Sequence, residues 1–252
     1  MNQETMEKMK QMKLFGMLRA FQSSMKAGIP EITADELVAH LIDTEFDERY
    51  NRKLDRLMKQ AEFRYKASFP EIDFQHPREL DKNKLMRLSD SSWVSGSQNV
   101  LLTGPTGAGK SYLACAIGYQ CCIQGWKVRY FNFGKLFTHL KHCKADGSYL
   151  KEMAKLEKTD VLIIDDFGLQ PFDAFSRLTL LELLEDRYRK SPVVIASQLP
   201  VGKWHEVICD KTLADAICDR LLHNSFRFDL KGESIRKKYA VELDQSDPLL
   251  LN

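Results

Sequence analysis

The chain has no long hydrophobic stretch. Its longest unbroken aliphatic run, in 252 residues, is Val161–Ile164, whereas a helix needs roughly 20 apolar residues to cross a bilayer. Residues 1–13 alternate Met with Lys, Glu and Gln, and they lack the apolar core and small-residue cleavage site of a secretion signal. We therefore expect no membrane partner and a chain that works in the cytoplasm.

The spacing of the six cysteines is not that of a redox or zinc site. No C-x-x-C pair occurs, and several cysteines have apolar neighbours, among which free cysteine behaves as a small hydrophobe. His139, His142 and Cys143 are close in sequence, but a zinc site usually needs a second pair of ligands, and none is evident. We predict six reduced thiols: Cys115, Cys121, Cys122, Cys143, Cys209 and Cys218.

Neither sign of charge dominates. There are 37 Lys and Arg against 35 Asp and Glu, a formal net charge of +2, and the chain is 44% hydrophobic. This composition is typical of a soluble globular protein. A domain of about 150 residues buries roughly 68–70% of its unfolded surface, so no disulfide is needed for folding. The near-zero net charge conceals segments in which one sign of charge dominates. For binding a polyanion, this local distribution matters more than the net charge.

Residues 1–69 are predicted to form a small all-helical domain. Apolar side chains recur at helical spacing over residues 6–25, and a second helix is predicted from a capping box at 33–36 to about residue 66. The second helix is acidic at first and basic later. A DNA-binding or partner-binding surface and a solvated helix face are equally supported. The candidate DNA contacts here are Arg52, Lys53, Arg56 and Lys59.

Residues 70–98 are predicted to be a linker, because turn-forming clusters surround one short helix at about 79–88. After residue 98, short β-branched runs alternate with helical stretches. Such alternation predicts an α/β domain over residues 99–252, with a parallel sheet flanked by helices. The predicted strands are 100–103, 128–133, 161–165 and 193–197.

Residues 104–111 match the phosphate-binding pattern G-x-x-x-x-G-K-[ST], between a predicted strand and a predicted helix. The glycines let backbone N–H groups turn toward phosphate oxygens, and the helix N-terminus adds partial positive charge. Lys110 is predicted to neutralise the outer phosphates, and Ser111 to ligate Mg²⁺. The predicted nucleotide-binding residues are Gly104, Pro105, Thr106, Gly107, Ala108, Gly109, Lys110 and Ser111.

Two further strands end in polar residues that suit nucleotide chemistry. Asp165 and Asp166 follow four buried aliphatics, at the sheet edge where ligands bind in such folds. We predict that Asp165 ligates Mg²⁺ and that Asp166 orients the attacking water, although either acid could instead cap a turn. Ser197 and Gln198 are candidates to contact the γ-phosphate or the water, with a turn role as the alternative.

Together these segments resemble the AAA+ ATPases of the initiator and helicase-loader clade, and most closely the IstB-type insertion-sequence transposition helpers. The resemblance extends over essentially the whole chain, and its specific motifs lie in residues 104–237. Many AAA+ enzymes place Glu where this chain has Asp166, and the shorter side chain suits a slow switch triggered by a partner. The segments that carry the resemblance, besides residues 104–111, are 162–169, 196–200, 213–221 and 230–237.

The resemblance implies a role for two arginines. Arg220 would be an arginine finger that reaches a neighbouring subunit's nucleotide, and Arg236 would sense the γ-phosphate. The alternative for Arg220 is an ion pair with Asp215 or Asp219 of its own helix. The alternative for Arg236 is a DNA phosphate contact, together with Lys231, Lys237 and Lys238. Because 14 residues follow Lys238, the helical lid common in AAA+ proteins is expected to be absent or reduced.

The function implied is an ATPase, dependent on ATP and Mg²⁺, that forms homo-oligomers on double-stranded DNA and recruits and stimulates a cognate transposase. Lys141 and Lys144 are weaker DNA candidates. The main alternative is a replicative helicase loader, which would share the nucleotide residues but prefer single strands. A DNA clamp that binds ATP without needing hydrolysis is a second alternative. A small-molecule kinase is disfavoured because no Arg-rich lid is evident.

Overall fold

The computed structural model describes residues 2–27, 33–90 and 92–235. The chain divides into two compact units, Met1–Arg56 and Leu57–Asn252. The division falls inside one continuous helix, α3 (Ala34–Ala61). Among the residues described, no helix combines the length and the hydrophobicity needed to cross a membrane.

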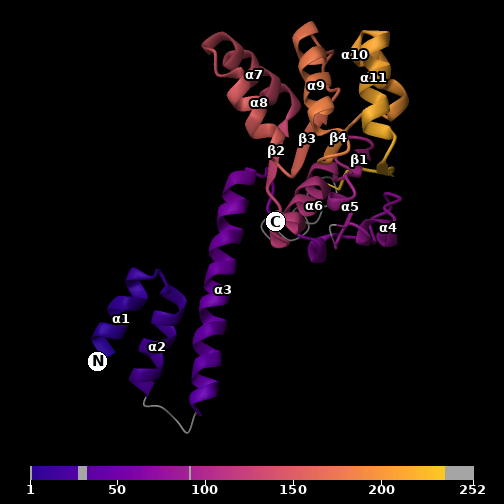
Figure 1. The fold of residues 1–252 in the computed structure, drawn as a ribbon. Helices are drawn as coiled ribbons and strands as arrows, with labels where there is room; N and C mark the ends of the chain where they lie inside the picture. The colour runs from indigo at the N-terminus through magenta and orange to yellow at the C-terminus, as the bar shows by residue number, and fades with distance from the viewer. Residues whose placement is uncertain (1, 28–32, 91, 236–252) are drawn as a thin grey trace, which may run out of the picture. The chain divides into compact units, whose positions relative to one another are not determined.

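Helices build the described part of the first unit. The prediction of one helix over residues 6–25 is wrong, because the chain turns at Lys13, whose φ of 58° lies in the left-handed region. The Leu14 N–H donates to the Met9 carbonyl at 2.8 Å and so closes the end of the first helix. No glycine marks this turn, so the apolar spacing alone suggested continuity. The helices are α1 (Asn2–Gln11), α2 (Phe15–Ala27) and the start of α3 (Figure 1).

A buried carboxylate from α3 holds the start of α2. Glu45 is 6% exposed, and its Oε2 accepts the backbone N–H groups of Gly16 at 2.8 Å and Met17 at 3.2 Å. A Cβ on Gly16 would lie 2.5 Å from the Thr44 carbonyl oxygen, so glycine permits the close approach of the two helices. These contacts satisfy helix N-terminal donors that would otherwise lack partners and fix where α2 begins.

A parallel five-stranded sheet, in the order β2-β3-β4-β1-β5, forms the centre of the second unit. All four predicted strands are confirmed. The fifth, at the edge beside β1, escaped prediction because the strands were identified by β-branched runs, whereas its sequence, SFRFD, has two alternating phenylalanines instead. The strands are β1 (Asn99–Thr103), β2 (Val128–Asn132), β3 (Val161–Phe167), β4 (Val193–Ser197) and β5 (Ser225–Asp229).

Different helices cover the two faces of the sheet. Ile163 of β3 lies against α6, whereas Leu162 and Ile164 join the hydrophobic core that includes α7, α9 and α11, as the alternation of a strand requires. Figure 1 shows α7, α8, α9 and α11 grouped on one side of the strands and α6 on the other. This arrangement confirms the predicted α/β class. The helices are α6 (Lys110–Ile123), α7 (Phe133–Asp146), α8 (Tyr149–Glu157), α9 (Ala174–Arg187), α10 (Trp204–Ile208) and α11 (Lys211–Leu222).

The segment before β1 is packed into the second unit. Leu85, Leu88 and Trp93 are fully buried, and the Trp93 indole N–H donates to the Leu88 carbonyl at 3.2 Å. The helix expected at about 79–88 is shorter than predicted and is followed by a further helical turn. The elements here are η1 (Phe69–Glu71), α4 (Lys82–Met86) and α5 (Ser92–Ser95), and a second 3₁₀ turn, η2 (Val201–Lys203), follows β4.

The cysteines are free thiols, and all but Cys209 are buried. Burial raises the pKa of the Cys115 thiol to about 11 and that of Cys122 to about 12. Burial likewise raises the pKa of Cys218 to about 11. At neutral pH these three groups are protonated and inert, because the thiolate is the reactive form. They serve the fold as small apolar side chains.

We expect Gly118→Ala to destabilise the protein by about 1–3 kcal/mol through overpacking. A Cβ at position 118 would lie 2.5 Å from Phe63 Cε1 and 2.7 Å from Ile163 Cδ1, so α6 would be pushed away from the sheet. Urea unfolding measures the effect. The matched control is Gly202→Ala, because a Cβ at Gly202 meets no atom within 4 Å. Equal stability of the two variants would contradict the tight packing of α6.

Candidate nucleotide-binding site

The phosphate-binding pattern folds as a loop between β1 and α6. Gly107 has φ 85° and Gly109 has φ 89°, which L side chains rarely adopt, and α6 begins immediately afterwards at Lys110. The first backbone N–H groups of a helix have no partner inside the helix. The loop therefore presents donors and the positive end of a helix dipole at one place.

The segment 230–235 lies directly against this loop. The Leu230 N–H donates to the Thr103 carbonyl at 2.8 Å, and the Ile235 N–H donates to the Gly107 carbonyl at 3.0 Å. A Cβ on Gly107 would overlap the Ser234 hydroxyl. Gly107 is thus required by the loop conformation and also by its contact with the chain's own later segment.

Lys110 points into the loop. Its side chain is largely buried, at 7% exposed, and its Nζ donates to the carbonyl oxygens of Gly104 and Pro105 at 2.8 Å each. These contacts hold the ammonium group at the centre of the loop. Any phosphate bound there would meet a fixed positive charge.

Asp165 is buried behind the loop. It is 1% exposed, its Oδ1 accepts the Asp166 N–H at 2.8 Å, and its Oδ2 accepts the Tyr130 hydroxyl at 2.5 Å. Burial, followed by the hydrogen bond to Asp165, raises the pKa of the Tyr130 phenol. Tyr130 therefore stays a neutral donor and fixes the orientation of the carboxylate.

Asp166 is more accessible and has a left-handed backbone, with φ 57°. Its Oδ2 accepts Asn132 Nδ2 at 2.8 Å and lies 3.5 Å from Arg64 Nη1. The same guanidinium nitrogen lies 3.7 Å from Asp165 Oδ2. Sequence reasoning missed these partners. The position of Asn132 at the end of a predicted strand was a usable signal, but nothing local marks Arg64.

Ser197 and Gln198 are adjacent in sequence but lie in different surroundings. Ser197 is fully buried, and its Oγ donates to the Phe167 carbonyl at 2.7 Å, linking β4 to the end of β3. Gln198 Oε1 accepts the Thr106 hydroxyl at 2.6 Å, beside the phosphate-binding loop. Gln198 is therefore the member of the pair that faces the loop.

A cavity of about 630 Å³, a size typical of small-molecule sites, is lined by Lys110, Asp166 and Gln198, whereas Asp165 and Ser197 are buried outside its lining. Arg78 braces its floor, because Nη1 donates to the Ala108 carbonyl at 3.2 Å and Nη2 donates to the Asp73 carbonyl at 2.8 Å. The segment predicted as a linker thus forms part of the wall. Besides Thr106, Gly107, Gly109, Lys110 and Ser111, the lining includes Arg64, Tyr65, Glu71, Asp73, Arg78, Tyr112, Asp166, Leu169, Gln198 and Ile235.

The oxygen groups here fit a magnesium ion in their chemistry. Ser111 lines the cavity with Asp166, and Asp165 lies next to Asp166 with its carboxylate oriented by Tyr130. Hydroxyl and carboxylate oxygens are the ligands that Mg²⁺ prefers, and the ion usually keeps several waters beside one or two protein ligands.

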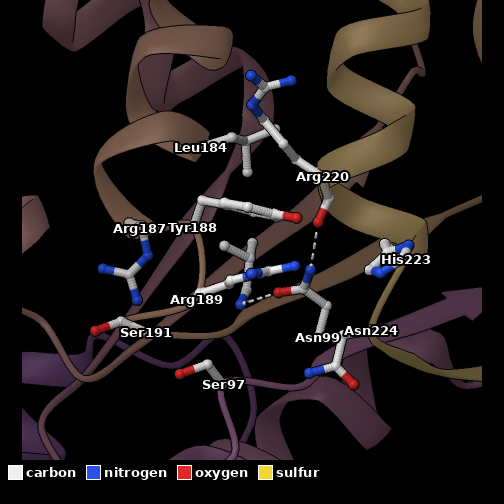
Figure 2. A pocket seen from close by; sticks show the side chains of 11 residues that line it. Ser97, Asn99, Leu184, Arg187, Tyr188, Arg189, Ser191, Arg220, His223 and Asn224 are labelled. Carbon is white, nitrogen blue, oxygen red and sulfur yellow. Dashed lines mark hydrogen bonds between the residues drawn. The ribbon is translucent and has the colours of Figure 1, made fainter.

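Arg220 lies far from this cavity. The Asn99 side-chain amide donates to the Arg220 carbonyl at 2.9 Å (Figure 2). Asn99 begins β1, and the other end of β1 leads into the phosphate-binding loop. The length of β1 alone, about 13 Å, separates Asn99 from the start of the phosphate-binding loop. The Arg220 guanidinium pairs with Glu185 of α9 rather than with an acid of its own helix.

The candidate DNA residues have varied surroundings. Arg52 pairs with Glu45 and Glu48 of its own helix, each at 3.7 Å. Lys141 lies 3.7 Å from Asp173, and Lys144 lies over the rings of Tyr149 and Phe175. Three further candidates on α3 are exposed: Lys53, Arg56 and Lys59. Arg236, Lys237 and Lys238 lie outside the described residues.

Comparisons with known proteins agree with this geometry. Residues 7–242 match the family described as IstB-like ATP binding protein. A protein of Sinorhizobium fredii, named as an insertion sequence ATP-binding protein, is 40% identical over 234 residues, which cover 92% of this chain and 96% of that one. The ATP-binding protein of insertion sequence IS5376 from Geobacillus stearothermophilus is 31% identical over 223 residues, covering 88% and 89%.

Solved structures share the fold. The crystal structure of DnaI superposes with a TM-score of 0.55 at 21% identity, covering 66% of this chain and 91% of that chain. AMPPCP-bound DnaA from Aquifex aeolicus superposes with a TM-score of 0.58 at 13% identity, covering 76% and 58%. The sheet, the phosphate-binding loop and the extent of the sequence match lead to one conclusion: the chain belongs to the IstB-like family of insertion-sequence ATP-binding proteins, with an AAA+ fold.

Proposed function

We propose that this protein is a DNA-dependent ATPase that assembles on double-stranded DNA, recruits the transposase of its insertion sequence and stimulates insertion there. The observation that carries the proposal is the separation of two groups. Lys110, Asp166 and Gln198 line one cavity, whereas Arg220 lies at the opposite edge of the sheet. With Arg220 as the proposed arginine finger, the catalytic site would be completed by a second copy of the chain.

In the proposed reaction, the loop N–H groups and Lys110 hold the β- and γ-phosphates of ATP. Ser111 and Asp165 would hold Mg²⁺, which would neutralise charge along the triphosphate. Asp166 accepts a hydrogen bond from the attacking water, and Gln198 contacts the water or the γ-phosphate. Asn132 fixes Asp166 through the 2.8 Å hydrogen bond.

Arg220 would act on the nucleotide of the adjacent copy. A guanidinium is permanently charged and forked, so it can stabilise negative charge that develops on a phosphoryl group. Hydrolysis would then depend on assembly, and assembly on ATP. Arg236 is proposed either to sense the γ-phosphate or to contact DNA with Lys237 and Lys238.

The proposal is tested by the rate of ATP hydrolysis across a protein concentration series, with and without duplex DNA. We expect the rate per subunit to rise with concentration and with DNA, and DNA binding to weaken steeply as salt increases, because phosphate contacts dominate. A rate per subunit that changes neither with duplex DNA nor with protein concentration would contradict the proposal. Stimulation by single strands alone would favour a helicase loader.

Arg64→Ala is expected to lower the Mg²⁺ concentration that gives half-maximal nucleotide binding, by up to about fivefold. The Arg64 guanidinium lies 3.5 Å from Asp166 and 3.7 Å from Asp165. Its positive charge therefore competes with Mg²⁺ for these two carboxylates. Titration of a fluorescent ATP analogue at several Mg²⁺ concentrations measures the change.

The matched control is Arg129→Ala, because Arg129 pairs with Glu62 at 3.7 Å and not with these acids. A higher Mg²⁺ requirement in Arg64→Ala would contradict this reasoning and would indicate that Arg64 holds the nucleotide itself.

A further inference from the structure

A second pocket, of about 250 Å³, lies at the N-terminal ends of the strands, away from the phosphate-binding loop. It opens where β1 and β4 begin, at Asn99 and Val193. We call it the basic pocket, after Arg187, Arg189, Arg220 and His223, which line it (Figure 2). None of the described lining residues carries a carboxylate. Such a pocket suits an anion.

The three arginines of the basic pocket differ in what they already bind. Arg187 is 2% exposed, and its guanidinium donates to four backbone carbonyls at 2.8–3.2 Å, so it is a structural brace. Arg220 is paired with Glu185. Arg189 is exposed, and among the described residues no carboxylate lies within ion-pair distance of it. Its charge is therefore available to a ligand.

The backbone holds Arg189 in an unfavourable conformation. Its φ of 57° is left-handed, which disfavours a side chain with a Cβ. Hydrogen bonds from the N–H groups of Lys190 and Ser191 to the Arg187 carbonyl, at 2.9 and 3.0 Å, fix the turn around it. The turn therefore fixes the point from which the Arg189 side chain leaves the backbone.

The Tyr188 ring fixes the direction of the Arg189 side chain. Its guanidinium carbon lies 5.3 Å from the centre of the Tyr188 ring, and Figure 2 shows it reaching across the pocket below that ring. Stacking on an aromatic face limits the rotamers of an arginine and leaves its N–H edge free to donate. Arg189 is thus oriented before any ligand arrives.

We infer that Arg189 is a second arginine supplied in trans, which contacts the triphosphate of the ATP held by a neighbouring copy of this chain, together with Arg220. The inference rests on the proposed function. It is favoured over a DNA contact because Arg189 lines the same pocket as the backbone of Arg220, and because β1 separates both arginines from the phosphate-binding loop of their own subunit. In Figure 2 the Arg220 guanidinium lies on the other side of the Tyr188 ring from Arg189, so each forked cation would reach different oxygens of the triphosphate.

Arg189→Ala is expected to lower the turnover rate at saturating ATP by at least about tenfold, since removal of one charged donor at a developing charge typically costs 10²–10³. The affinity of the dilute chain for a fluorescent ATP analogue should not change, because the loop of the same subunit is intact. Assembly induced by a non-hydrolysable ATP analogue, followed by light scattering, should require more protein. Lys190→Ala is the matched control, because Lys190 is exposed, adjacent and outside the pocket lining.

Mixing of variants distinguishes action in trans from a local structural effect. Arg189→Ala is mixed with Asp166→Ala, which keeps its arginines but lacks the residue proposed to orient water. In a random assembly about one quarter of the interfaces join an intact catalytic site to an intact Arg189, so activity should recover to about that fraction of the wild type. Absence of recovery would overturn the inference.

A parallel mixture of Arg220→Ala with Asp166→Ala separates the two levels of the argument. Recovery there, without recovery for Arg189→Ala, would refute only the role of Arg189. If neither mixture recovers and the wild type shows no dependence on concentration, the proposed function itself fails. Arg189→Ala that retains ATPase activity but binds duplex DNA more weakly, with a salt slope reduced by about one, would assign Arg189 to DNA instead.

Discussion

Lys110→Ala is expected to weaken ATP binding by about 10²- to 10³-fold, because it removes a buried cation from the centre of the phosphate-binding loop. Lys110 is 7% exposed, and its Nζ is held by the Gly104 and Pro105 carbonyls at 2.8 Å. No other side chain of the loop carries a charge. Equilibrium titration with a fluorescent ATP analogue measures the loss, and urea unfolding verifies that the variant is folded.

Asp166→Ala is the informative companion variant. Asp166 lies in the cavity wall but belongs to the end of β3 and not to the loop, so its removal should leave ATP binding nearly intact and abolish hydrolysis. Support of the transposase by Asp166→Ala would indicate a clamp that needs ATP binding alone. Tight ATP binding by Lys110→Ala would contradict the proposed position of the phosphates.

Arg220→Ala is expected to lower the rate of ATP hydrolysis by about 10³- to 10⁵-fold, the range found for arginine fingers, while ATP binding by the dilute chain is retained. The reason is distance, because the Arg220 carbonyl accepts from Asn99 at the start of β1, away from the loop of the same subunit. Steady-state hydrolysis at saturating ATP and high protein concentration measures the change.

Glu185→Gln controls for the ion pair. It removes the carboxylate that pairs with Arg220 but keeps the guanidinium, which also donates to the Ala216 carbonyl at 2.8 Å. Glu185→Gln should therefore hydrolyse ATP at least as fast as the wild type. Near-normal hydrolysis by Arg220→Ala would rule out a trans arginine at this position.

Much of the second unit is predictable because its signals are local. The run Val161–Ile164 is buried on both faces of a sheet, which strongly favours a strand, and the glycine spacing of residues 104–111 reflects the backbone conformation of the loop itself. By contrast, β5 depends on pairing with β1 from more than 100 residues away. Its own five residues carry only a short alternation of two phenylalanines with polar residues.

The residues missed around the site have the same explanation. Arg64 and Tyr130 reach Asp165 through tertiary structure, and neither stands in a recognisable pattern. The turn at Lys13 is another example, since the contact of Glu45 with the start of α2 favours it and the local sequence does not. Where a long-range contact outweighs local preference, one sequence read alone is insufficient.

The distribution of thiols offers a practical handle. Cys209 is exposed, while the other five are buried, and three of those have a pKa of about 11 or 12. A maleimide fluorophore reacts with an accessible thiolate, so brief treatment of the unmodified protein should label Cys209 selectively. Donor-labelled and acceptor-labelled chains could then be mixed, and energy transfer would follow their association in real time without any engineered cysteine.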